Sequence, residues 1–196
     1  MLRPRCRVVA LAALWGLALL LLASGRGWAG PLRISNLVVT NTDRILLVNA
    51  VLLGSLPETV VEGLGTGMSA TVRFQVELWQ HNSWWVDRRI AAKILERKVV
   101  YDVLTKEYRV SAVQGEERDP YVTRDIWEAE RVVSEVRALR LAPISSLRAQ
   151  DLYYVRVRAE VRSGAPDSLS NIMPFWSTGV ETDWERSPLL TVGRKR

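Results

Sequence analysis

The chain has 196 residues, of which 27 are lysine or arginine and 21 are aspartate or glutamate, so its formal net charge is +6. It contains one histidine, His81, and one cysteine, Cys6. Structural zinc needs four cysteine or histidine ligands and catalytic zinc needs three protein ligands. The sequence also has neither a glycine-rich phosphate motif nor a G-x-S-x-G nucleophile turn. The composition therefore predicts no metal, no cofactor and no serine hydrolase, and it leaves His81 as a polar loop residue.

The first 29 residues have the layout of a secretory signal peptide. Three arginines precede an uncharged apolar run over residues 8–23, and small residues flank Trp28 at the expected cleavage site after Ala29. The apolar run is shorter than the ~20 residues of a spanning helix, which favours a cleaved leader. A leader retained as a membrane anchor is the alternative. We expect export to the periplasm.

Loss of this leader changes the charge and the redox chemistry of the chain. Cys6 and four arginines lie in the leader, which leaves 23 basic and 21 acidic residues and no thiol from Gly30 onward. This small charge surplus gives no support for nucleic-acid binding, and a cysteine protease is excluded. The remaining chain is long enough to be stabilised as one domain by its core.

The next segments predict a hairpin and a short helix. Residues 32–40 are rich in strand formers, and residues 41–44 predict a turn. Residues 45–54 are apolar on both faces, which predicts a strand buried in the middle of a sheet. Ser55 is expected to cap a short helix that ends at Gly65.

The middle of the chain predicts three strands. Residues 69–80 alternate between apolar and polar side chains, which predicts a strand with one buried face. Residues 93–104 and 108–112 predict two more strands around a turn at 105–107, followed by a polar loop over residues 114–120. In the strand over residues 69–80, the side chains expected to face the core are Val72, Phe74, Val76 and Leu78. Those expected to face solvent are Thr71, Arg73, Gln75 and Glu77.

Residues 125–139 predict the longest helix. Asp125 and Glu128 stand at capping-box spacing, apolar side chains recur at helical spacing, and Pro143 is expected to stop the helix.

Residues 152–162 predict a strand with Tyr153 facing the core and Tyr154 facing solvent. After residue 162 the side chains show no clear periodicity. We therefore expect residues 30–162 to form one domain and residues 163–196 an irregular tail docked on it. Mostly short connections between at least six strands, with two helices, predict an α+β fold built on an antiparallel sheet or sandwich. An all-β sandwich with helical insertions is the alternative.

The stretch WQHNSWWVDRRI over residues 79–90 concentrates aromatic and basic side chains. Cross-strand packing at a hairpin end is one interpretation, with Asp87 in an exposed ion pair with an adjacent arginine. A contact surface is the other, because adjacent tryptophans on a strand point to opposite faces and tryptophan with arginine is typical of interface anchors. The candidate binding residues are Trp84, Trp85, Arg88 and Arg89.

A carboxylate-dependent hydrolase is a further possibility, because two carboxyl groups from any part of a chain can form a glycosidase site. No acid is singled out by its position, so we expect a non-enzymatic protein with no catalytic residue. The available acids are Glu77, Asp87, Glu116, Glu117, Asp183 and Glu185.

Three segments resemble a family of exported proteobacterial proteins, the domain of unknown function 4390. They are VNAVLLGSLPETVVEGLGTGM, WWVDRRIAAKILERKVVYDVLTKEYRV and SSLRAQDLYYVRVRAEV, in this order between residues 32 and 162. The resemblance implies a signal-bearing, single-domain protein without an assigned activity. Family genes often lie near membrane sensor kinases, which implies a link to envelope signalling.

Together these observations predict a periplasmic, non-enzymatic interaction module. We expect it to bind an envelope protein, with a membrane sensor kinase as the candidate, through the tryptophan-rich hairpin end and the outward strand faces. The alternative is a glycan- or lipid-binding domain that uses the same tryptophans.

Overall fold

The computed structural model describes residues 32–42, 44–164 and 178–192. The expected leader, and Phe175 and Trp176 of the tail, lie outside the described residues. The strands and helices are β1 (Arg33–Asn41), β2 (Ile45–Leu53), α2 (Glu58–Gly65), β3 (Ser69–His81), β4 (Arg88–Asp102), β5 (Glu107–Gln114), β6 (Tyr121–Thr123), α3 (Ile126–Ser134), β7 (Glu135–Pro143), η1 (Ile144–Ser146), β8 (Leu152–Gly164), β9 (Thr178–Glu181) and β10 (Glu185–Arg186).

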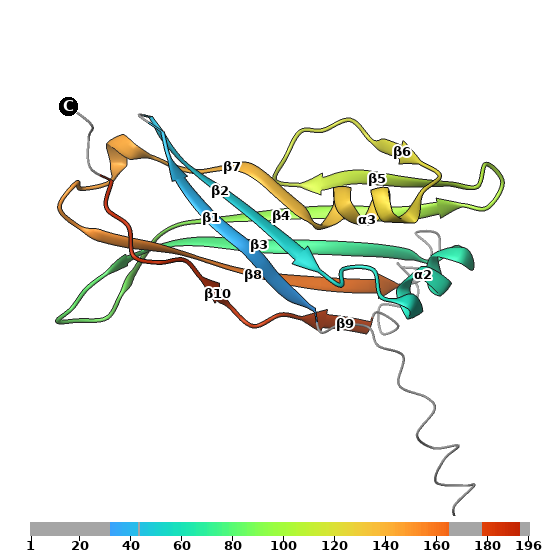
Figure 1. The fold of residues 1–196 in the computed structure, drawn as a ribbon, viewed down its shortest axis with the longest axis horizontal. Helices are drawn as coiled ribbons and strands as arrows, with labels where there is room; N and C mark the ends of the chain where they lie inside the picture. The colour runs from blue at the N-terminus through green and yellow to red at the C-terminus, as the bar shows by residue number, and fades with distance from the viewer. Residues whose placement is uncertain (1–31, 43, 165–177, 193–196) are drawn as a thin grey trace, which may run out of the picture.

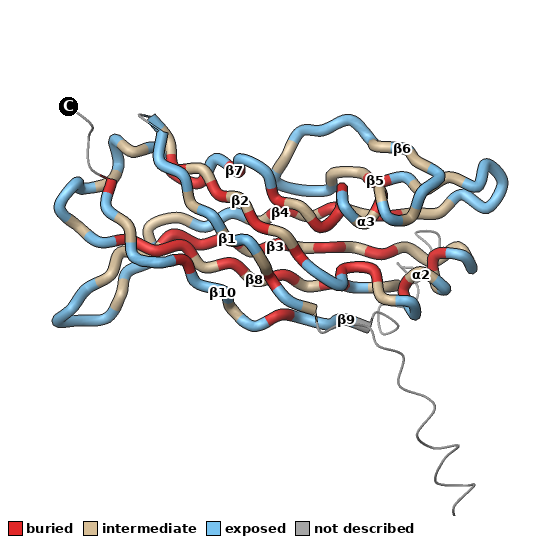
Figure 2. The backbone as a smooth tube through the Cα atoms, viewed as in Figure 1, coloured by how far each residue is buried: buried red, intermediate tan, exposed pale blue. Residues whose placement is uncertain are grey.

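These elements form two antiparallel sheets with two α-helices, which confirms the α+β prediction. The smaller sheet has the order β1-β2-β7, and the larger one has the order β10-β8-β3-β4-β5-β6, with β9 also paired to β8. The small sheet lies across the large one, and buried segments follow β2, β3 and β8 where the sheets overlap (Figures 1 and 2). No helix in the described residues is long and apolar enough to cross a membrane.

Strand β3 is the centre of the large sheet. It pairs with β4 on one side and with β8 on the other over nearly its whole length. The four apolar side chains predicted to face the core are fully buried, which confirms the alternation. Burial of such side chains is the main source of stability in a domain without disulfides.

Strand β2 is the middle strand of the small sheet, as predicted, but only one of its faces is fully buried. Leu46, Val48, Ala50 and Leu52 are buried, whereas the alternate side chains are half-buried and Leu53 is exposed. The expectation of a strand buried on both faces is therefore wrong.

The predicted helix over residues 125–139 is only half correct, because α3 ends at Ser134 and the chain continues as β7. The Arg97 guanidinium donates to the carbonyl oxygens of Val132 at 2.8 Å and Glu135 at 2.6 Å. In a continuing helix, the N–H of residue 136 would bond to the Val132 oxygen. Arg97 takes this acceptor, and the following residues pair with β2 instead.

The caps of the two helices also differ from expectation. Asp125 caps α3 by accepting from Trp127 N, but Glu128 accepts from Tyr121 and Thr123, so the capping box is not formed. The N-cap of α2 is Pro57. Ser55, the expected cap, donates to Glu130 instead.

The described part of the tail runs along the edge of β8. Strands β9 and β10 pair with β8. Between and after them, Thr182 and Ser187 each exchange hydrogen bonds with the backbone of β8, at Ala159 and Val155. Residues 163 and 164, expected to begin the irregular tail, are the last residues of β8.

Candidate functional site

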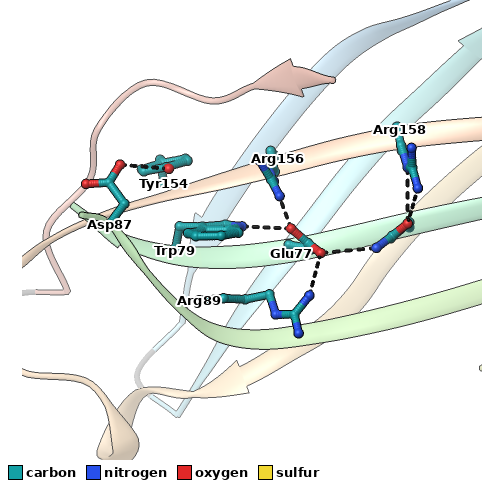
Figure 3. Close-up of polar contacts among 8 residues, drawn as sticks. Glu77, Trp79, Asp87, Arg89, Tyr154, Arg156 and Arg158 are labelled. Atoms are coloured by element: carbon teal, nitrogen blue, oxygen red, sulfur yellow. Dashed lines mark hydrogen bonds and ion pairs between the residues drawn. The ribbon is translucent and has the colours of Figure 1, made fainter. Parts of the chain in front are cut away.

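A buried carboxylate organises the outer face of the large sheet. Glu77 is 1% exposed, although the alternation of β3 predicted that it faces solvent. It accepts hydrogen bonds from Arg156 at 2.7 Å, Trp79 at 2.8 Å, Arg89 at 3.1 Å and Gln75 at 3.1 Å. Figure 3 shows the donors converging on this side chain from β3, β4 and β8.

Two opposing effects set the pKa of Glu77. Burial of the carboxyl group raises its pKa, and the hydrogen bonds from Arg156, Trp79 and Arg89 lower it. The net result is a pKa below the ordinary value. Glu77 is therefore a carboxylate at neutral pH, and it partly neutralises two arginines.

Aromatic rings and arginines stack in a row next to Glu77. The Arg156 guanidinium lies 4.3 Å from the Trp79 ring centroid and 4.2 Å from that of Trp184. Trp79 stacks on Tyr154 with the ring centroids 6.5 Å apart, and Arg186 lies 3.5 Å from the Tyr154 centroid. Cation–π contacts of this kind stabilise partly buried arginines, and Trp184 fixes the tail onto the sheet.

Asp87 closes the hairpin between β3 and β4. It accepts from Tyr154 Oη at 2.8 Å and from the backbone N–H of Asn82 at 2.9 Å, and it lies 3.1 Å from His81 Nδ1. The Asn82 N–H and the Tyr154 hydroxyl hold the pKa of Asp87 below its ordinary value. His81, predicted to be a loop residue, is the last residue of β3.

The two arginines after Asp87 bond elsewhere. Arg88 donates to Gln80 at 3.1 Å, and Arg89 donates to Glu77. The expected exposed ion pair between Asp87 and one of these arginines is therefore wrong.

The hairpin end presents three consecutive apolar side chains to solvent. Trp84 is 94% exposed, Trp85 is 81% exposed and Val86 is 75% exposed. We call these three residues the tryptophan tip. Cross-strand packing, the first interpretation of this stretch, is wrong for Trp84 and Trp85. Of the three tryptophans in residues 79–90, Trp79 alone is half-buried.

The structure brings the four candidate binding residues to one end of the molecule. Trp84 and Trp85 form the tip, and the exposed Arg88 and Arg89 begin β4 directly behind it. The end of the β3–β4 hairpin lies at the same end of the molecule as the loop that leads into β8 (Figure 1). The supporting row of Glu77, Trp79, Tyr154, Arg156 and Trp184 was missed, although aromatic and charged residues at outward strand positions are a signal for it.

Two clefts elsewhere are lined mainly by charged side chains. One, of about 400 Å³, includes Arg97 and Glu116, which form a bidentate ion pair. The hydrogen bond from Arg97 holds the pKa of Glu116 below its ordinary value. The other, of about 270 Å³, includes Arg158 and Glu181. Neither is lined by the tryptophan tip.

The described residues contain no group of three or more histidine, cysteine, aspartate or glutamate side chains that could hold a metal ion. Of the six acids considered for catalysis, Glu77, Asp87 and Glu116 are occupied by hydrogen-bond donors of the fold. Glu117 and the tail acids Asp183 and Glu185 are exposed.

Comparison with known proteins gives a family and nothing beyond it. A family model described as a domain of unknown function (DUF4390) matches residues 29–188. The match includes most of the tail, beyond the 32–162 segment on which the sequence resemblance was based. No curated protein and no solved structure matches the chain.

Proposed function

The chain belongs to the DUF4390 family, and we propose that it is a periplasmic, non-enzymatic docking module that binds another envelope component through the tryptophan tip. One observation carries this proposal. Two adjacent tryptophans, 94% and 81% exposed, stand on a hairpin end held by hydrogen bonds. Large exposed apolar patches on soluble domains mark interaction sites.

The rigidity of the hairpin supports a binding role. The Asp87 carboxylate accepts a hydrogen bond from the Asn82 N–H. The Asn82 side chain in turn accepts a hydrogen bond from the backbone N–H of Trp84 at 3.1 Å. Tyr154 attaches Asp87 to β8, and the Glu77 network fixes the strands behind it. A preorganised tip loses little conformational entropy on binding.

The acids at this end support a structural rather than a catalytic role. A general acid or base needs a free oxygen within reach of the substrate. Four donors converge on Glu77, and three groups contact Asp87. Both acids have low pKa values because they are hydrogen-bonded, which is the opposite of the raised pKa of a general acid.

The protein partner suggested by the family resemblance, a membrane sensor kinase, remains a prediction. Such a partner would bring the module close to the bilayer. A second candidate, a glycan, would have to stack on the exposed tryptophans themselves, because neither of the two charged clefts is lined by them.

Photo-crosslinking in intact cells tests the docking function. A photoreactive amino acid at position 85 should form an envelope adduct, and the same residue at position 127 should not. Trp127 is a matched control because it is 74% exposed but lies on α3, toward the other end of the molecule (Figure 1). Equal labelling from both positions, or none from position 85, would refute the proposal.

A further inference from the structure

We propose that the tryptophan tip docks on the surface of an anionic phospholipid bilayer, where Trp84, Trp85 and Val86 insert among the headgroups. This inference rests on the docking function proposed above and names its partner. It follows from the shape, the charge and the rigidity of the hairpin end.

The shape of the tip favours a lipid surface over a protein pocket. Its three side chains are consecutive and each is at least 75% exposed, so they protrude rather than line a hollow. The two indoles offer on the order of 300–500 Å² of surface. The headgroup region receives such a protrusion without a preformed cavity, and tryptophan prefers it because the ring is apolar while its N–H stays hydrated.

The charge behind the tip favours an anionic surface. Arg88 and Arg89 directly follow it and are exposed. Asp87 is the only acid in residues 79–90. Its carboxylate accepts hydrogen bonds from Tyr154 and from the backbone of Asn82. Arg89 shares the single carboxylate of Glu77 with another arginine, so this cluster retains a positive charge.

The neighbouring loop does not reverse this charge. Asp151, which precedes β8 at the same end, accepts a hydrogen bond from Gln80 at 2.7 Å. Arg148, in the same loop, is exposed. Basic residues near an anionic membrane surface each strengthen binding, so the apolar tip and the arginines act together, as reversible peripheral anchoring requires.

Vesicle binding tests the inference. The protein is expressed with its own leader, purified, and mixed with vesicles of phosphatidylethanolamine and phosphatidylglycerol or of phosphatidylcholine alone. We expect co-sedimentation with the anionic vesicles and a blue shift of tryptophan emission. The W84A/W85A variant should bind at least about tenfold more weakly, and R88Q about fivefold more weakly to anionic vesicles only.

Two controls separate the outcomes. W127A should bind like the wild type, and all variants share the same N-terminus, so a retained leader cannot produce the difference. Equal binding of the wild type and W84A/W85A, or no binding of the wild type, would overturn the lipid inference. If the wild type does not bind vesicles while position 85 still crosslinks to an envelope protein, the docking function stands and its partner is a protein pocket.

Discussion

The guanidinium of Arg156 lies 2.7 Å from the carboxylate of Glu77 and is held between the rings of Trp79 and Trp184. The Glu77→Gln variant keeps the size of the side chain but removes the charge that these donors require. We expect the free energy of unfolding to fall by about 2 kcal/mol, because the half-buried Arg156 and Trp79 lose a charged acceptor. Urea unfolding measures this, and Glu62→Gln, on the exposed side of α2, should change stability by less than about 0.5 kcal/mol.

The same network predicts a loss of stability in acid. The folded pKa of Glu77 is below its ordinary value of 4.5, so its stabilising contribution is complete above that value and is lost as the pH falls through the folded pKa. Asp87, Glu116 and Glu128 have lowered pKa values and act in the same direction. Stability measured against pH should therefore fall below about pH 4.5, and more steeply in the wild type than in Glu77→Gln. Equal slopes would contradict this role for Glu77.

Arg97 should be necessary for the junction between α3 and β7. Its guanidinium is 3% exposed and joins the Glu116 carboxylate to the backbone oxygens of Val132 and Glu135. Arg97→Met leaves these acceptors unpaired and should cost about 3 kcal/mol. Arg97→Lys should recover only part of this, because one ammonium group cannot reproduce the fork of donors. Full stability of Arg97→Met by urea unfolding would contradict the assignment.

Gly115 allows the chain after β5 to turn toward Arg97. Its φ is +85°, and an added Cβ would lie 1.9 Å from the carbonyl oxygen of Ile94. Gly115→Ala should therefore destabilise the protein by at least about 2 kcal/mol. Gly65→Ala is the matched control, because its Cβ would have no neighbour within 4 Å, and thermal unfolding should show no loss for it.

Export is testable on the native product. The signal-peptide layout of residues 1–29 predicts a periplasmic protein that begins near Gly30. Mass spectrometry of the N-terminus after cell fractionation should show this form. An intact Met1 in a cytoplasmic fraction would contradict both the export prediction and the docking function.

The positions of β1 to β5 and of β8 were predictable because each of these strands has its own pattern, whereas β6, β7, β9 and β10 were not predicted. The alternation of β3 and β8 places the core side chains correctly, because one face of each strand is buried against the small sheet. Tyr154, predicted to face solvent, is also buried. The end of α3 was not predictable from local periodicity. It depends on Arg97, which is 35 residues from Val132 in sequence.

The candidate site likewise has one part that the local sequence predicted and one part that depends on contacts between distant strands. The aromatic and basic composition of residues 79–90 indicated a contact surface, and the exposure of Trp84 and Trp85 agrees with it. Alternation alone could not show that Glu77 is buried on the outward face. Its cover comes from Arg156 on β8 and Arg89 on β4, so it depends on strand order and register.

The described part of the tail also protects the large sheet. β8 has 13 residues, and without β9 and β10 its outer edge would present unpaired N–H and C=O groups along its length. Open edges of this kind recruit strands from other molecules. A protease cut before Thr178 that released the tail would therefore convert this domain into a template for self-association, and it would also take Val192 out of the apolar core.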